Sequence, residues 1–187
     1  LDAGNTAYNL PNFYQLNGHF NFTDFEQAVT ELVRRHEILR TNFQVVNGAP
    51  VQVIHSPQNI QIPIINLEGL KRDEQALEVK FLCDKDANQP FDLARDSLLR
   101  LTLIRLNTQT HVLIIYTHHI VFDAWSMGTL MQELSILYDA SKQKRPSPLP
   151  ELSLQYVDFA IWETEWLKSE NFSEELSYWQ QKLAGMT

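Results

Sequence analysis

The chain has 187 residues, of which 44% are hydrophobic and 20% are charged, and its formal net charge is −8. This length and composition are ordinary for one globular domain with a substantial core. The negative charge argues against binding to nucleic acid or to anionic membranes. No apolar run is long enough to span a bilayer, so we expect neither a nucleic-acid partner nor a membrane partner.

Cysteine content and the first residues bear on the compartment. Cys83 is the single cysteine, so an intramolecular disulfide framework is excluded. The first five residues lack the basic region and apolar run of a secretory signal. Both features predict a protein of the reducing cytoplasm. The neighbours of the cysteine, Phe81 and Leu82, predict a buried thiol.

Apolar periodicity predicts six elements in the first half of the chain. They are a strand over 12–20, a helix from Thr23 to about His36, hairpin strands over 39–46 and 51–55, a strand over 60–66 and a helix over 71–88. Thr23 and Glu26 have the spacing of a capping box. Pro63 indicates that its strand lies at a sheet edge, because proline cannot donate to a neighbouring strand. In the last of these helices we expect an inward face, made by Ala76, Leu77, Phe81 and Leu82.

In the second half of the chain, the pattern of apolar residues and prolines predicts two strands, three helices and a connector. They are strands over 98–106 and 111–117, a helix from near Met127, a Pro-rich connector over 145–150, and helices over 154–168 and 173–183. We expect the two strands to pair antiparallel. The mixture predicts an α+β fold, with a mixed or antiparallel sheet packed against helices. Residues 1–145 would form the sheet-and-helix core, and residues 146–187 the connector with two helices.

Two adjacent histidines, His118 and His119, end the second of these strands. Because successive strand side chains point to opposite faces, one histidine should face a cavity and the other the body of the protein. This geometry argues against a shared metal site. A histidine beside a tight strand-to-helix turn is a candidate general base, since its pKa lies near neutrality. The alternative is a pair of strand-end histidines that only satisfy backbone groups.

Asp123 and Ser126 follow the histidines closely, and Ser126 is the predicted N-cap of the next helix. Other chemistries lack their motifs: the sequence has no Gly-x-Ser-x-Gly elbow and no phosphate-binding glycine loop. The remaining histidines lack the spacing of metal ligands, so no metal site is expected. His118, His119 and Asp123 are therefore the one concentrated candidate site.

Three stretches of the sequence point together to one family. They are His118 to Asp123 followed by Trp125-Ser126, Arg35 to Phe43 with the pattern Arg-His-Glu-x-Leu-Arg-Thr-x-Phe, and Tyr156 to Trp162 with the pattern Tyr-x-Asp-Phe-Ala-x-Trp. In this order they resemble the motifs of the condensation domains of non-ribosomal peptide synthetases. Those domains have the chloramphenicol-acetyltransferase-like fold, and the resemblance implies one lobe of it here.

The resemblance implies an acyltransferase that forms a peptide bond. Donor and acceptor would arrive as thioesters on the phosphopantetheine arms of two carrier domains, and no metal or diffusible cofactor would be bound directly. The implied partners are both carrier domains, the C-terminal lobe of the condensation domain, and an adenylation domain of the same synthetase. Two alternatives stay open: a CoA-dependent acyltransferase of the same superfamily, and a non-catalytic carrier-binding lobe.

The resemblance also implies roles for single residues. His119 would be the central catalytic residue, with His118 beside it, and Asp123 would be structural and paired with Arg35. The motif residues expected to support the site are Arg35, Arg40, Ala124, Trp125, Ser126, Gly128, Tyr156, Asp158 and Trp162. Simpler roles are a solvated helix-end charge for Arg35 and plain helix packing for Trp162.

The sequence departs from the family in two ways. Ala124 stands where the family usually has glycine, which would allow a close backbone approach or a positive φ. Alanine there could crowd the substrate and reduce activity. Family domains are also more than twice this long and have two lobes, so we expect this chain to be the N-terminal lobe, with the second lobe outside it.

Overall fold

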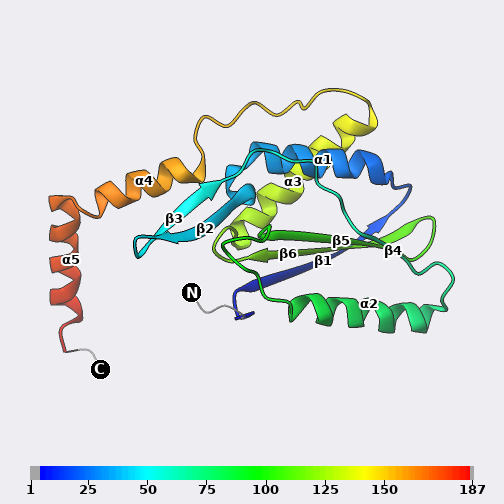
Figure 1. The fold of residues 1–187 in the computed structure, drawn as a ribbon, viewed down its shortest axis with the longest axis horizontal. Coiled ribbons are helices and arrows are strands. Elements are labelled where there is room, and N and C mark those ends of the chain that lie inside the picture. The colour runs from blue at the N-terminus through cyan, green and yellow to red at the C-terminus, as the bar shows by residue number, and fades with distance from the viewer. Residues whose placement is uncertain (1–4, 186–187) are drawn as a thin grey trace. The chain divides into compact units, whose positions relative to one another are not determined.

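The computed structural model describes residues 5–185, and Figure 1 shows their fold. The chain divides into two compact units, one ending at Glu151 and the other beginning at Leu152. The elements of the first unit are β1 (Asn9–Asn17), α1 (Phe22–Arg35), the 3₁₀ helix η1 (Glu37–Arg40), β2 (Thr41–Val46), β3 (Ala49–Ile54), β4 (Ile64–Asn66), α2 (Arg72–Ala87), β5 (Leu99–Arg105), β6 (Thr110–His118) and α3 (Ala124–Lys142). The second unit contains α4 (Tyr156–Trp166) and α5 (Glu170–Leu183). The predicted α+β class is confirmed.

The main sheet has four strands in the order β1-β6-β5-β4. The predicted antiparallel pair β5–β6 is present, and β1 also pairs antiparallel with β6. β4 pairs parallel with β5 at the edge, as its proline predicted, although the strand begins only at Ile64. Pro63 itself contributes its carbonyl, which accepts a hydrogen bond from the Leu103 N–H at 2.9 Å. β2 and β3 form a separate hairpin, turned by Asn47 and Gly48, both of which have positive φ.

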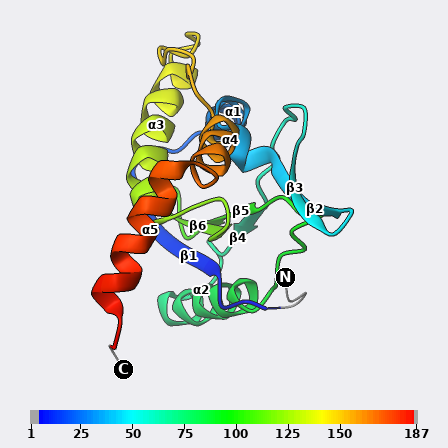
Figure 2. The same ribbon diagram turned by 90° about the vertical axis from the view of Figure 1, so that its left-hand side faces the viewer.

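Helices cover both faces of the main sheet. α1 and α3 lie together over one face and α2 lies under the other, as Figures 1 and 2 show from two directions. The apolar stripes of α1 and α3 enter the same core as β5 and β6. In α3 this stripe follows the predicted spacing: Leu130, Leu134 and Leu137 are buried, and Met127, Met131 and Tyr138 pack against the core. β6 is therefore enclosed by β1 and β5 at its sides and by helices above and below.

Two helix predictions are wrong in detail. α1 begins at Phe22 and is capped by Asn21, whose Oδ1 accepts from the Asp24 N–H at 3.1 Å, so Thr23 is not the cap. Of the expected inward residues of α2, Leu82 packs against the core as predicted, whereas Ala76, Leu77 and Phe81 are exposed, the last two at 70% and 59%. The reason is the side chain of Gln75, which donates to the carbonyls of Leu67 and Leu106 at 2.9 and 2.8 Å and so turns its own face of the helix inward.

The inward face of α2 is the face on which Gln75 lies, because helix residues three or four positions apart point to the same side. Val79, Leu82 and Cys83 pack against the core along this face. The Cys83 thiol is half-buried rather than buried as expected, and desolvation raises its pKa. A second departure is η1, since the hairpin strand expected from Leu39 starts only at Thr41. There the Thr41 hydroxyl donates to the Glu37 carbonyl at 2.7 Å and closes the 3₁₀ turn.

The Pro-rich connector is fastened to both ends of α1. At its start Lys144 has φ +53, and its Nζ lies 2.6 Å from Oδ1 of the buried Asp24 at the beginning of α1. At its end Arg34 contacts Glu151 at 2.5 Å, and Arg35 donates to the Pro150 carbonyl. The connector therefore runs back along α1 from its first turn to its last, as Figure 1 shows.

The second unit consists of α4, α5 and the turn between them. Along α4 the rings of Phe159, Trp162 and Trp166 follow one another at centroid distances of 5.7 and 6.1 Å, and Phe172 of α5 meets Trp166 at 5.1 Å. Trp162 therefore packs within its own helix. Neither unit, over residues 5–185, has a helix with the length and apolar character needed to cross a bilayer.

A buried histidine makes the stability of the fold depend on pH. His111 of β6 is buried between Phe20 and Phe22, with ring centroids 5.3 and 5.5 Å away. Its Nδ1 makes no hydrogen bond among the described residues. Desolvation, with a smaller effect of the Arg105 charge, lowers the pKa of His111 below its ordinary value of 6.5.

We predict that the free energy of unfolding falls as the pH drops below about 6.5, because the unfolded chain then binds this proton more readily than the folded chain. One such proton changes the unfolding free energy by at most about 1.4 kcal/mol per pH unit. Urea unfolding between pH 7 and 5 measures the slope. His111→Leu should make the slope shallower and leave the part contributed by His118, whose pKa is also lowered by burial. His55→Leu, at an exposed position, should leave the slope unchanged. Equal slopes in the wild type and in His111→Leu would contradict the prediction.

Candidate active site

One of the two histidines is buried in the body of the protein and the other is exposed, as the alternation of strand side chains predicted. His118 is the last residue of β6 and is 8% exposed, with Tyr8 and Phe91 around its ring at 6.0 and 6.1 Å. Its Nδ1 accepts a hydrogen bond from the Ile120 N–H at 3.1 Å, which holds the turn after the strand. Burial, and then the neighbouring His119, lower the pKa of His118, so this ring is kept neutral near pH 7. His118 is a structural element of the turn.

His119 is exposed at the same turn. Its backbone N–H donates to the Tyr8 carbonyl at 2.9 Å, so the main chain is fixed while the imidazole faces outward. Tyr8 thus contacts both histidines, one through its ring and the other through its carbonyl. Sequence reasoning did not single out Tyr8, and its only signal was its position just before the first strand. The structure therefore exposes the imidazole of His119 and buries that of His118.

Asp123 does not pair with Arg35, which corrects the expected ion pair. It is the N-cap of α3, and its Oδ1 accepts from the backbone N–H of Ser126 at 2.8 Å and from the Ser126 hydroxyl at 2.6 Å. These two hydrogen bonds, the hydroxyl first, lower the pKa of Asp123. The predicted cap, Ser126, is instead the residue that is capped. An aspartate at this position is well suited to the positive end of the helix dipole.

Arg35 binds a residue that sequence reasoning missed. Its Nε donates to Oε2 of Glu133 in α3 at 3.0 Å, and the same oxygen lies 2.6 Å from Nε2 of His36. The side chains of Arg35 and Glu133 are only 5% and 13% exposed, so Arg35 is not a solvated helix-end charge. Glu133 lies on the apolar side of α3, between Leu130 and Leu137. A carboxylate within an apolar stripe is the signal that could have revealed it.

The first turns of α3 carry the remaining motif residues Ala124, Trp125 and Gly128, all exposed. Trp125 is 87% exposed. Ala124 is the first residue of the helix and does not have a positive φ, so alanine causes no backbone strain there. No atom outside its chain neighbours and its own helix backbone lies within 4 Å of a Cβ built on Gly128, so no close approach requires a glycine.

The other predicted site residues serve local structure. Arg40 donates to the His55 carbonyl and pairs with Glu37 at 3.2 Å, which ties η1 to the end of β3. Tyr156, Asp158 and Trp162 lie in the second unit. There Oδ2 of Asp158 accepts from the Gln155 N–H at 2.8 Å and closes the first turn of α4.

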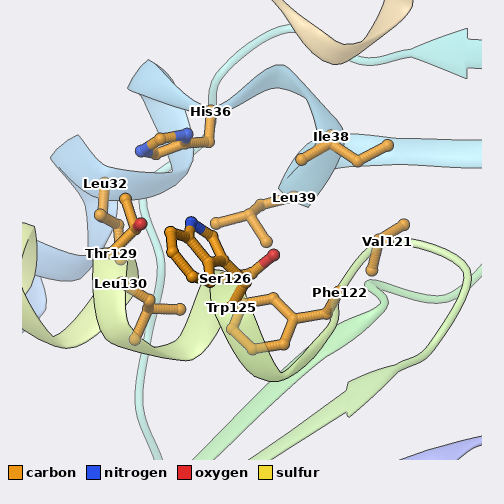
Figure 3. Close-up of a pocket in the computed structure, with 10 residues that line it drawn as sticks. All are labelled: Leu32, His36, Ile38, Leu39, Val121, Phe122, Trp125, Ser126, Thr129 and Leu130. Atoms are coloured by element: carbon orange, nitrogen blue, oxygen red, sulfur yellow. The ribbon is translucent and has the colours of Figure 1, made fainter. Parts of the chain in front are cut away.

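An apolar pocket of about 160 Å³, partly open to solvent, lies beside the loop that follows His119. His119 itself is not among the residues that line it, so the expectation that one histidine faces a cavity is not met at this pocket. Figure 3 shows His36 and Trp125 over it, with Leu39 and Phe122 nearby. Its walls come from the end of α1, η1, the loop after β6 and the first turns of α3. The lining residues are Leu32, His36, Ile38, Leu39, Val121, Phe122, Trp125, Ser126, Thr129 and Leu130. Among residues 5–185 no three side chains of histidine, cysteine, aspartate or glutamate are grouped as a metal site.

This chain belongs to the condensation domain family, whose model matches residues 1–187. It is 42% identical over 184 residues to chondramide synthase cmdD of Chondromyces crocatus, a match that covers 98% of this chain and 5% of that protein. It is 39% identical over 179 residues to gramicidin S synthase 2 of Brevibacillus brevis, a match that covers 96% of this chain and 4% of that protein. The chain thus spans a small share of the synthases that it matches.

Among solved structures, the chain resembles the X-domain in a complex with OxyB from teicoplanin biosynthesis. The identity is 27% and the TM-score is 0.85, over 97% of this chain and 39% of the X-domain chain. The likeness therefore extends over almost all of this chain and over less than half of its structural relative.

Because Asp123 and Arg35 have separate partners, we predict that Asp123→Ala and Arg35→Ala lower the free energy of unfolding additively. Arg35→Ala and Glu133→Ala should instead show a coupling of about 0.5–3 kcal/mol, as expected for residues in direct contact. Urea unfolding of the single and double variants measures both cycles. A coupling between Asp123 and Arg35 as large as that between Arg35 and Glu133 would contradict this prediction and support the Asp123–Arg35 ion pair expected from the sequence.

Proposed function

We propose that this chain is the histidine-bearing lobe of an amide-forming condensation domain in non-ribosomal peptide synthesis. Its substrates are a donor thioester and an acceptor amine, each carried on the phosphopantetheine arm of a carrier domain. The observation that supports this proposal is the difference in burial between the two histidines at the end of β6. The His119 imidazole is exposed, while His118 is buried and holds the turn.

The reaction balances without an added reagent. The acceptor amine attacks the carbonyl carbon of the donor thioester, the C–N bond forms and the C–S bond breaks. The sulfur leaves as the thiol of the donor arm and takes up the proton lost by the amine. His119 can remove that proton, orient the amine, or donate a hydrogen bond to the tetrahedral intermediate. The thioester brings its own activation, so the proposed step uses no metal.

The surrounding residues hold His119 rather than take part in the chemistry. The backbone N–H of His119 is bound to Tyr8, and the next residue, Ile120, is bound to the ring of His118. Asp123 ends the loop by capping α3. These three contacts fix the main chain on both sides of the imidazole. Orientation of this kind contributes to rate because the reacting groups need not be ordered during the reaction.

A second candidate function is a lobe that binds other proteins without catalysis. The X-domain that this chain resembles was solved in complex with OxyB. Ala124, where glycine is usual in the family, is the feature of this chain that fits such a role. A complete synthetase would also contain carrier and adenylation domains, which we propose as neighbours on the basis of the synthases that this chain matches.

We predict that His119→Ala, made in the protein that contains both lobes, lowers the rate of dipeptide formation about 10²–10⁴-fold, the usual loss for a general acid or base. The measurement is transfer of a radiolabelled aminoacyl group between two loaded carrier domains. His55→Ala serves as the control because His55 is also exposed and lies after β3, outside the loop that carries His119. Near-normal turnover by His119→Ala would exclude a catalytic role and would favour the binding lobe.

We further predict that residues 1–187 alone form no measurable peptide bond although their core folds. One lobe presents His119 but cannot enclose both substrates, and orientation supplies roughly 7–11 kcal/mol of barrier lowering in well-organised systems. The same transfer assay, with a circular dichroism melt to verify folding, tests this. Turnover at the rate of a two-lobed domain would show that this lobe is sufficient.

A further inference from the structure

Glu133 connects three segments of the first unit through its side chain. Its Oε2 accepts a hydrogen bond from the Nε of Arg35 at 3.0 Å and lies 2.6 Å from Nε2 of His36. Arg35 also donates to the carbonyl of Pro150, at the end of the connector. One carboxylate in the middle of α3 is therefore bound to the last turn of α1 and, through Arg35, to the connector.

The apolar contacts between α1 and α3 do not by themselves specify how α3 is rotated or how far it slides. The burial of leucine side chains such as Leu130, Leu134 and Leu137 is non-directional, and apolar cores tolerate repacking at modest cost. A buried carboxylate that must meet two donors has few alternatives, since leaving either donor unpaired is costly.

The hydrogen bonds of Tyr138 to the Asn21 N–H at 2.9 Å and of Ser141 to Gln27 at 2.8 Å link the other end of α3 to α1. The contacts of Glu133 are the ones that fix α3 at the end nearer to the histidine loop.

The placement of α3 determines where the histidine loop ends. The loop begins at His119, which is fixed to Tyr8, and it ends at Asp123, the cap of α3. Glu133 lies ten residues after this cap, about 15 Å along a rigid helix. Any slide or rotation of α3 is therefore transmitted to Asp123 and to the five-residue loop.

Glu133 also shapes the pocket beside the loop. It holds the ring of His36, which lies over the pocket opposite Thr129 and Leu130, as Figure 3 shows. Thr129 is one helical turn before Glu133 on the same side of α3. The same contacts that place the helix therefore also place one wall of the pocket.

We infer that Glu133 is a positioning residue of the condensation site, acting through Arg35 and His36 on α3 and thereby on the loop that carries His119. This inference rests on the proposed function. It assigns to Glu133 a part in the reaction that none of the sequence motifs indicates, because the residue lies outside all three of them.

The experiment uses the protein that contains both lobes and compares Glu133→Gln, Glu133→Asp and Asp139→Asn. Glu133→Gln keeps the shape and removes the charge, and Glu133→Asp keeps the charge but is one methylene too short to reach both partners. Asp139→Asn is the matched control, since Asp139 is an exposed carboxylate of the same helix with no ion pair among the described residues. We measure kcat and KM in the transfer assay, the melting temperature, and hydrogen exchange of the amides of Ile120 and Ser126.

We expect Glu133→Gln to lower kcat about ten- to a hundredfold, the effect of displacing a reacting group by a fraction of an ångström to one ångström. KM for the acceptor carrier should stay within about twofold, because the carrier surface is unchanged. The Ser126 amide, held by Asp123, should exchange at least about tenfold faster. Glu133→Asp should shift kcat and exchange in the same direction, and Asp139→Asn should match the wild type.

A lowered melting temperature with kcat and amide exchange equal to the wild type, measured well below the melting transition, would overturn the inference and leave Glu133 a purely stabilising residue. If the wild-type protein forms no peptide bond, the proposed function fails instead. In that case the exchange of the Ile120 and Ser126 amides still decides whether Glu133 positions the loop.

Discussion

Burial of β6 is the constraint on which the site depends. Its residues 113–116 are at most 1% exposed, because β1 and β5 flank the strand and helices cover both faces. A one-residue change of register would exchange the two covered faces, so every side chain of the strand would lose the neighbours against which it packs. The direction of each side chain at its end is therefore determined, so that His118 enters the protein and His119 leaves it.

The polar contacts around α1 complete what this burial begins. Arg35 and His36 meet Glu133 of α3, while Arg34 and Arg35 hold the end of the connector. Lys144 and Asp24 hold its beginning. α1 is thus the element to which both α3 and the connector are tied. A buried ion pair adds little to stability in general, and its contribution here lies in selecting one arrangement of elements that apolar contacts alone would leave less specific.

These features explain physically how the first unit holds the end of β6. The histidine side of the site is built entirely from local contacts within the first unit: a neutral buried histidine, a capped helix and a main chain held by Tyr8. Trp125 and His119 are exposed in this unit. In our proposal the lobe supplies an oriented imidazole, and the enclosure comes from the rest of the domain and from the carriers.

The sequence alone determined the fold class, the β5–β6 pair, the burial of one histidine with the exposure of the other and the family, because these follow from local periodicity and from contiguous motifs. It did not determine the partner of Arg35, since Asp123 and Glu133 are equally plausible carboxylates until α3 is placed against α1. It also misassigned the inward face of α2, where Gln75 overrides Leu77 and Phe81 by reaching two backbone carbonyls. Such choices depend on which distant groups come within hydrogen-bonding distance, and only the tertiary structure decides that.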